Sequence, residues 1–275
     1  MHEEGIRQVE IGLLLEGVQQ VHGYDFRQYN EASLRRRLEQ WLSGSDYLSF
    51  GAALSAVLRD AAACEALVRG ITVNVTEMFR DPAFFLALRK EVVPYLQTWP
   101  HAKLWVAGCA TGEEVYSLAI VLHEEGLIER CRIYATDINQ KVLEVAQKGI
   151  YPLKSMQQYT RNYQKAGGRA AFSDYYQARY DHAIMDPTLR RNVLFAVHNL
   201  VTDADFSEMQ LILCRNVLIY FQPTLKAQVI GLFDRCLTPG GFLCLGAKEV
   251  LEGYACDARY AEQVPRSRIY RKGYA

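Results

Sequence analysis

The sequence feature that most constrains the fold is the alternation of short apolar runs with helix-length segments beyond residue 102. Runs expected to form strands cover 103–107, 132–136, 193–197, 211–213 and 242–245, and 268–270 can close the sheet. Helices are expected directly after Gly112 and over about 139–148 and 224–237. Strands separated by helices form a parallel sheet covered on both faces, so we expect a doubly wound α/β fold. Ligands on such sheets bind beyond the carboxyl ends of the strands.

The chain before this region has the pattern of short amphipathic helices. Apolar residues recur at the spacing of one buried helix face at Leu34, Leu38, Trp41 and Leu42. A second segment, 52–66, is rich in alanine and leucine and contains no proline. The expected divisions are an all-helical domain over 1–70, a linker over 71–101 and a catalytic domain over 102–275.

One stretch of the catalytic domain interrupts the alternation of strands and helices. Residues 151–192 carry six tyrosines, and Tyr176, Ala178 and Tyr180 alternate as in a strand. We interpret this stretch as an inserted small antiparallel β subdomain. The alternative is a long connection without structure of its own.

Composition narrows the class of protein. Lys+Arg and Asp+Glu balance at 31 each, which argues against nucleic acid as a partner. The seven cysteines are scattered without a CxxC pair, which predicts buried reduced thiols and no metal site. No leader pattern and no run of 18 apolar residues is found, so we expect a cytoplasmic protein without membrane insertion.

The turn Gly108–Gly112 follows the first strand, at the nucleotide-binding position of a Rossmann-like sheet. Glu113 and Glu114 come directly after it, where two carboxylates would repel a phosphate and suit a cationic ligand. S-adenosylmethionine, which carries a sulfonium and an ammonium, is such a ligand. The alternative is that both acids complement the helix dipole. The GxGxxG pattern of nicotinamide enzymes is absent.

Asp137 ends the second strand, where a carboxylate can accept hydrogen bonds from both ribose hydroxyls of an adenosine. The alternative role is an N-cap of the following helix, and the two roles are compatible.

Six motifs in chain order make the sequence similar to a known family. They are Asn74–Arg80, Gly108–Glu114, Ala135–Ile138, Gly149–Tyr151, His198–Leu200 and Cys214–Phe221. Together they resemble the CheR chemotaxis receptor methyltransferases. The resemblance implies a class I methyltransferase fold with S-adenosyl-L-methionine as cofactor and S-adenosyl-L-homocysteine as product. It also implies protein-glutamate O-methylation, giving γ-methyl esters on the cytoplasmic helical domain of chemoreceptors, by a protein expected to be a monomer.

The same resemblance implies the site residues. Those expected at the cofactor are Asn74, Thr76, Arg80, Glu113, Glu114, Asp137, Asn199, Leu200, Asn216 and Val217, with one or both glutamates taking part. Arg80 is expected to pair bidentately with the methionine carboxylate, and Tyr220 to point its hydroxyl toward methyl transfer. Each residue has an alternative role. Arg80 could be an ordinary surface arginine, Asn199 and Asn216 could only make turns, and Tyr220 could be packed in the core.

Methyl transfer to glutamate needs no deprotonation by the protein, because a glutamate carboxylate is already ionised at neutral pH. Positioning and exclusion of water would suffice, and no general base or metal is expected. For substrate binding, the family implies basic residues of the helical domain, here Arg35, Arg36 and Arg37. A solvated polar face is the alternative, because residues 1–70 hold seven Lys+Arg and ten Asp+Glu.

The sequence departs from the family at three places. Val115 replaces a common proline, Gly246–Glu249 replaces a glycine-serine-glutamate pattern, and Gly167–Arg169 only partly fits a site for a receptor's C-terminal tail. The second and third departures favour an alternative, a methyltransferase of the same fold acting on another protein or a small carboxylic acid. A third hypothesis is a non-catalytic module that binds the cofactor and docks on receptors. It ranks last, because the residues whose loss would indicate it, Arg80, Asp137 and Arg215–Val217, are all present.

Overall fold

The structure is a computed structural model that describes residues 2–73 and 75–274. The chain divides into two compact units. The helical unit takes in the chain up to Val73 together with Asn199–Ala204 and Ile219–Val229, and the catalytic unit contains the rest. Two short distal segments therefore belong to the helical unit although they lie far along the sequence.

The helical unit contains α1 (His2–His22), α2 (Glu31–Ser43), α3 (Phe50–Arg59) and α4 (Ala61–Ile71). The alanine-rich run expected as one helix is divided at Asp60, whose side chain caps the amide of Ala62 and starts α4. Leu38, Val57 and Leu67 are fully buried in the core of the unit. The all-helical N-terminal domain is thus confirmed.

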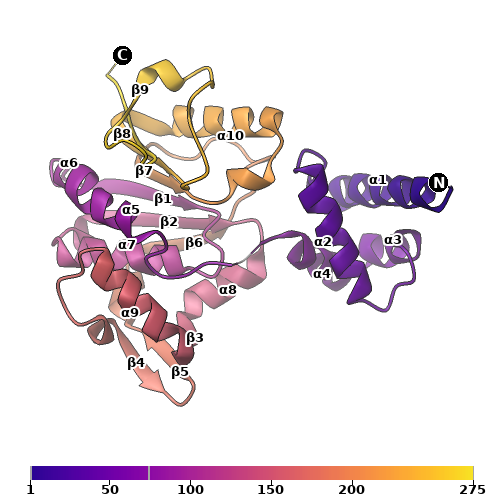
Figure 1. Ribbon diagram of the computed structural model, residues 1–275, viewed down its shortest axis with the longest axis horizontal. Coiled ribbons are helices and arrows are strands. Elements are labelled where there is room, and N and C mark those ends of the chain that lie inside the picture. The colour runs from indigo at the N-terminus through magenta and orange to yellow at the C-terminus, as the bar shows by residue number, and fades with distance from the viewer. Residues whose placement is uncertain (1, 74, 275) are drawn as a thin grey trace. The chain divides into compact units, whose positions relative to one another are not determined.

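A seven-stranded sheet forms the centre of the catalytic unit, with the order β6-β2-β1-β7-β8-β10-β9 (Figure 1). Its strands are β1 (Ala102–Ala107), β2 (Cys131–Asp137), β6 (Val193–Val197), β7 (Met209–Cys214), β8 (Leu237–Leu245), β9 (Tyr260–Glu262) and β10 (Ile269–Lys272). The first five strands in this order pair in parallel, and β10 runs antiparallel to both of its neighbours. This mixed sheet confirms the class I methyltransferase fold.

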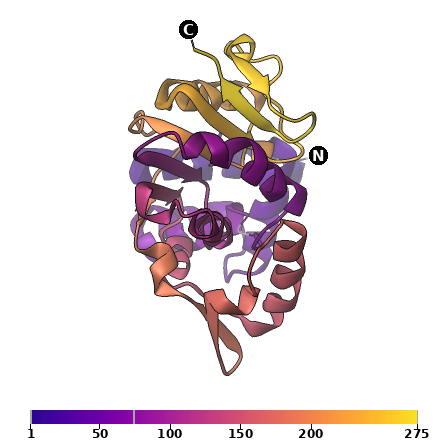
Figure 2. The same cartoon turned by 90° about the vertical axis from the view of Figure 1, so that its left-hand side faces the viewer.

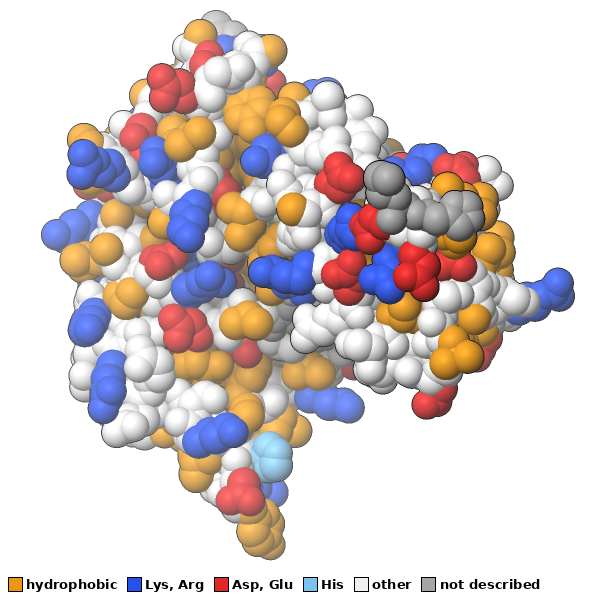
Figure 3. All heavy atoms as spheres, turned by 45° about the vertical axis from the view of Figure 1, so that its right-hand side comes forward, with side chains coloured by type: hydrophobic (Ala, Val, Ile, Leu, Met, Phe, Trp, Pro, Cys, Tyr) orange, Lys and Arg blue, Asp and Glu red, His pale blue; other side chains and the backbone are white. Residues whose placement is uncertain are grey.

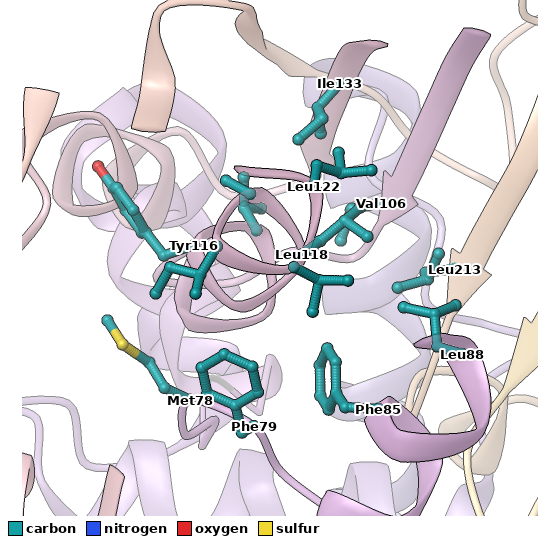
Figure 4. Close-up of a cluster of buried hydrophobic side chains, with 14 of the residues drawn as sticks. Met78, Phe79, Phe85, Leu88, Val106, Tyr116, Leu118, Leu122, Ile133 and Leu213 are labelled. Atoms are coloured by element: carbon teal, nitrogen blue, oxygen red, sulfur yellow. The ribbon is translucent and has the colours of Figure 1, made fainter. Parts of the chain in front are cut away.

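Helices cover both faces of this sheet (Figures 1 and 2). They are α5 (Pro82–Ala87), a π-helical turn (Leu88–Val92), α6 (Val93–Leu96), α7 (Glu113–Glu124), α8 (Gln140–Lys148) and α10 (Pro223–Cys236). Short 3₁₀ helices span Ile128–Arg130, Leu153–Ser155, Phe172–Tyr175, Pro187–Arg190, Leu218–Tyr220 and Asp257–Arg259. Figure 4 shows Leu118 and Leu122 of α7 packed among Val106, Ile133 and Leu213 of three neighbouring strands.

The opposite face of the sheet has its own aromatic core. Trp105 of β1 stacks on Phe206 with ring centroids 4.8 Å apart and meets Phe233 of α10 edge to face at 5.3 Å. Because side chains alternate along a strand, Val106 and Trp105 serve opposite faces. Residues buried on both faces explain why the strands appear as continuous apolar runs in the sequence.

The expected insert is present as a three-stranded antiparallel sheet. Its order is β3-β5-β4, with β3 (Ile150–Pro152), β4 (Tyr176–Arg179) and β5 (His182–Met185). The subdomain also contains α9 (Met156–Lys165), which the sequence analysis did not predict. Tyr159 and Tyr163 lie four residues apart on its buried face, so two of the six tyrosines mark a helix.

Two features near the C-terminus differ from what the sequence predicted. The strand expected over 242–245 begins earlier, at Leu237, so β8 starts directly after α10 ends at Cys236. Met209 pairs with Leu237 and Leu211 with Phe242, so the extra residues of β8 form an irregularity in the ladder. β9 was also missed, because it has only three residues, two of them exposed, and so shows no alternation of buried and exposed positions.

The expected burial of the cysteines is confirmed at all seven positions, and burial raises the pKa of the Cys109 and Cys214 thiols. Within the described ranges, no helix is both long and apolar enough to cross a membrane.

Candidate functional site

The candidate site lies where the carboxyl ends of β1, β2 and β7 meet. We call this set of residues the cofactor edge: Gly108–Glu114, Asp137, Asn139, Arg215–Val217 and Gly246–Glu249. In the strand order, β2 and β6 lie on one side of β1, and β7 and β8 lie on the other, so the direction in which successive strands are added reverses at β1. Open α/β sheets bind ligands at such a switch point.

The loop after β1 is held tightly against β2. The amides of Gly108 and Cys109 both donate to the carbonyl of Thr136, at 2.8 and 2.9 Å. A side chain on Gly108, which has φ of 72°, would place its Cβ 2.5 Å from Val217. Ala110 is also left-handed, with φ of 47°. The glycine is therefore required by both the backbone conformation and the close approach of Val217.

Asp137 is nearly buried, with 8% exposure, at the end of β2. One of its carboxylate oxygens accepts the Ala110 amide and the other the Asn139 amide, both at 2.9 Å. Desolvation raises the pKa of the Asp137 carboxyl, opposed by these hydrogen bonds. Asn139, not Asp137, caps α8, because its Oδ1 accepts the Lys141 amide at 3.0 Å. The cap interpretation of Asp137 was wrong, and its oxygens keep lone pairs for further donors.

The two glutamates after the loop have different surroundings. Glu113 is 6% exposed, accepts hydrogen bonds from Thr111 (2.6 Å) and Tyr159, and belongs to no salt bridge within the described part of the chain. Burial raises the pKa of Glu113 to about 7. Glu114 accepts a charge-assisted hydrogen bond from Arg215 at 2.5 Å. Glu113 is therefore the carboxylate whose charge the protein leaves uncompensated.

Arg215 is a member of the site that the sequence analysis did not assign. Its side chain is 2% exposed, and it donates to Glu114, to Asp81 at 2.8 Å and to the carbonyl of Arg80 at 3.3 Å. Its guanidinium carbon lies 3.9 Å from the ring centre of Phe84. The available signal was a charged residue directly after the buried strand β7, inside the Cys214–Phe221 motif.

Asn216 and Val217 follow on the same turn. Asn216 has φ of 62°, a left-handed conformation that asparagine tolerates better than most residues. Its amide donates to Glu249 at 2.9 Å, and the amide of Gly246 donates to the same oxygen at 2.6 Å. Glu249, part of the segment noted as a departure from the family, thus fastens the turn to the end of β8.

Arg80 lies half-buried on the segment before α5, with its Nη1 3.2 Å from the carbonyl of Val75. The residues on either side of it, Phe79 and Asp81, are both left-handed, with φ of 53° and 57°. Thr76 is half-buried on the same segment, and Asn74 lies outside the described residues. Arg80 is joined to the cofactor edge through its backbone, by way of Arg215.

Three of the residues expected at the cofactor or at methyl transfer belong to the helical unit: Asn199, Leu200 and Tyr220. Asn199 is engaged in a turn, because its Oδ1 accepts the Val201 amide at 3.0 Å and its amide donates to Asp203. Leu200 is half-buried in that turn. The carbonyl of Tyr220 accepts the Asn30 amide at 2.7 Å.

The three arginines of α2 differ in their partners. Arg35 pairs with Glu4 and, at 3.1 Å, with Glu39. Arg37 is half-buried with its guanidinium carbon 5.8 Å from the Tyr220 ring centre, and desolvation lowers its pKa. Arg36 is exposed and takes part in no salt bridge in the portion of the chain described. Figure 3 shows acidic and basic side chains interspersed over the N-terminal helices.

The residues of the cofactor edge fit the cofactor that the motifs imply. Asp137 offers acceptors for ribose hydroxyls, and Glu113 offers an uncompensated carboxylate for an ammonium. The Nδ2 of Asn139 is buried beside Asp137 without a hydrogen-bond partner, as expected of a donor that serves a ligand. Among the described residues, no three His, Cys, Asp or Glu side chains gather as a metal site would require.

Comparisons with known proteins agree with this geometry. Residues 74–264 match the family described as "CheR methyltransferase, SAM binding domain". The chain is 50% identical over 272 residues to the Pseudomonas putida protein named "Putative methyltransferase Cher3", covering 99% of this chain and 100% of that protein.

Two further relatives are named "Chemotaxis protein methyltransferase". The one from Listeria monocytogenes is 32% identical over 229 residues, covering 82% of this chain and 84% of the relative. The one from Vibrio parahaemolyticus is 34% identical over 215 residues, covering 74% and 76%. With its class I fold and its match over 74–264, the chain belongs to the CheR family of S-adenosylmethionine-dependent methyltransferases.

Proposed function

We propose that this protein methylates glutamate side chains on the cytoplasmic helical domain of bacterial chemoreceptors, giving γ-methyl esters. The observation that carries the proposal is the family match over 74–264, with chemotaxis methyltransferases among the relatives. The substrate then places the protein in the cytoplasm, where we propose that it acts as a monomer.

The proposed cofactor contacts follow from the chemistry of each group. Asp137 accepts hydrogen bonds from the ribose, Glu113 attracts the ammonium of the methionine part, and Arg80 pairs with its carboxylate. The remaining proposed contacts are Asn74, Thr76, Glu114, Asn199, Leu200, Asn216 and Val217. Glu114 is the weakest of them, because Arg215 already neutralises its charge.

S-adenosylmethionine supplies a methyl group on a sulfonium, which makes it an electrophile. The acceptor glutamate needs no general base, because it is ionised at neutral pH. Arg80 and Tyr220 are the proposed catalytic residues, and their task is to orient the reacting groups and keep water out. The protein would therefore act mainly by positioning.

For substrate binding we propose the exposed side of α2, with Arg36 as its principal charge. Arg35 is engaged by Glu4 and Glu39, and Arg37 lies against the Tyr220 ring. Of these three arginines, only Arg36 is both exposed and outside any salt bridge among the described residues, so its charge is the most accessible to an acidic receptor helix. Exposed charges of this kind steer association more than they hold the complex.

The test is incubation of the protein with methyl-labelled cofactor and a panel of receptor cytoplasmic fragments. Alkali-labile label on fragments with intact glutamates is the expected result, and fragments carrying Glu→Gln changes at the acceptor positions should not be labelled. The variant Asp137→Ala provides the control for cofactor-dependent transfer. Normal binding of S-adenosylhomocysteine together with no label on any fragment would reject the receptor as substrate.

A second candidate is a methyltransferase that acts on another protein or on a small carboxylic acid. It is favoured by the 50% identical relative, whose name states no substrate, and by the unusual Gly246–Glu249 segment. Alkali-labile label on a protein other than a receptor, or on a small acid, would support it.

A further inference from the structure

We propose that Arg215 is a positioning residue that fixes the direction in which Arg80 presents its guanidinium to the cofactor. The inference rests on the proposed contact between Arg80 and the cofactor carboxylate. The inference extends the proposed function, because it identifies the residue that orients Arg80, one of the two proposed catalytic residues.

Arg215 joins three separate segments of the catalytic unit with one side chain. It lies directly after β7 and donates to Glu114 in the first turn of α7 at 2.5 Å. Its other terminal nitrogen donates to the Asp81 carboxylate at 2.8 Å and to the Arg80 carbonyl at 3.3 Å. A planar guanidinium with its donors in a fixed fork can set all these groups in one geometry, which a lysine cannot do.

The backbone around Arg80 needs such a restraint. Phe79 and Asp81 both have positive φ, and a non-glycine residue persists in that conformation only where its surroundings determine it. On one side, the Phe79 amide donates to Ser117 at 2.8 Å and its ring meets Phe85 at 5.1 Å. On the other side, Asp81 is held by Arg215. Arg80 therefore sits between two strained residues, each fastened to the core.

The charges support a positioning role. One guanidinium faces two carboxylates, so Arg215 leaves no positive charge for a ligand. Its guanidinium lies over the Phe84 ring, and its side chain is almost fully buried. Arg80, in contrast to Arg215, is half-exposed, so its guanidinium is the one that can reach a ligand.

Arg89 provides a matched control within the same unit. Its side chain is 5% exposed, pairs with Glu124 and Glu125, and donates to the carbonyl of Ala166 at 3.1 Å. Like Arg215, it is buried and binds two carboxylates and one backbone carbonyl. It fastens α7 to the inserted subdomain, and among the described residues it has no hydrogen bond or salt bridge to the cofactor edge. Arg89→Lys should cost stability without affecting the cofactor.

The experiment is a double-mutant cycle on the full chain, read by calorimetric titration with S-adenosylhomocysteine. We expect Arg215→Lys to weaken binding about tenfold. In the Arg80→Lys background the same change should cost less than about twofold, because Arg215 acts through Arg80. Arg89→Lys should lower the melting temperature as much as Arg215→Lys and leave affinity within about twofold.

Three results would overturn the inference: equal effects of Arg215→Lys in both backgrounds, an equal loss of affinity in Arg89→Lys, or unchanged affinity in Arg80→Lys. If Arg215→Lys does not fold, Asp81→Asn takes its place in the cycle, with a severalfold loss expected, because Asp81 is partly exposed. The readout needs no receptor, so a wrong substrate assignment would leave a positive cycle intact.

Discussion

At the cofactor edge, Asp137 and Arg215 are buried and held by at least two hydrogen bonds each, whereas the arginines of α2 lie at or near the surface. Arg215 and Asp137 are almost inaccessible to water, and each has two or more fixed partners. Arg36 is exposed, and the ion pairs of Arg35 lie on partly exposed side chains. A buried charge needs partners in good geometry, whereas an exposed one is already solvated by water.

This difference separates two tasks. A buried and hydrogen-bonded edge can hold a cofactor in one orientation, so a change there should alter affinity or rate strongly. A solvated face can attract a partner from a distance, so a change there should alter encounter and its dependence on salt. The following predictions run from the largest expected effect to the smallest.

The largest effect should come from Arg80→Lys. An ammonium cannot form the two parallel hydrogen bonds of a guanidinium to a carboxylate, so methyl transfer should fall about 100-fold. Initial rates with labelled cofactor measure this, and Arg89→Lys is the control. A drop in melting temperature that matches the loss of rate would make Arg80 a structural residue.

Asp137→Ala should weaken binding of S-adenosylhomocysteine by about 1–3 kcal/mol, because buried hydrogen bonds to the ribose are lost. Isothermal titration calorimetry measures the change. The same experiment with NAD should show no binding to the wild type. Unchanged affinity in the variant would limit Asp137 to holding the amides of Ala110 and Asn139.

Glu113 should make stability depend on pH. Its pKa of about 7 in the folded protein is above the value of about 4.3 expected in the unfolded chain. Between these values the folded state holds a proton that the unfolded state has lost, so stability falls as the pH rises from about 4.3 to about 7.

Relative to Glu113→Gln, which cannot ionise, the wild type should lose on the order of 2 kcal/mol over that range. Denaturant unfolding at pH 5 and pH 7.5 tests this. Parallel stability curves for the two proteins would show that Glu113 does not carry the effect.

The smallest effect should come from Arg36→Glu. Reversal of one exposed charge should raise the apparent KM for receptor severalfold and make the rate less sensitive to salt, because screening acts over about 10 Å at 0.1 M. Arg69→Glu on α4, also exposed, is the matched control. If the methylation rates of wild type and Arg36→Glu depend on salt concentration in the same way, α2 presents only a solvated polar face and does not bind the receptor.

The sequence predicted the layout of the catalytic unit well, because its central strands β1, β2, β7 and β8 are buried and therefore form continuous apolar runs. The Gly108–Gly112 turn, Asp137 at a strand end and the insert were all found where expected. It failed where the signal depends on pairing, as in β8, whose bulge at 237–242 is set by β7. The sequence analysis also missed α9, because the whole of 151–192 was interpreted as an antiparallel β insert and the four-residue spacing of Tyr159 and Tyr163 was not used.

The sequence by itself determined the family, the cofactor class and the strand ends that carry the site, because these depend on local patterns and on motifs in order. Only the tertiary structure decided how charges are shared. Arg215 and Glu114 are 101 residues apart, and Arg215 and Asp81 are 134 apart. Contacts at such separations decide that Arg215 neutralises Glu114 and leaves Glu113 without a salt bridge. No local sequence pattern contains this information.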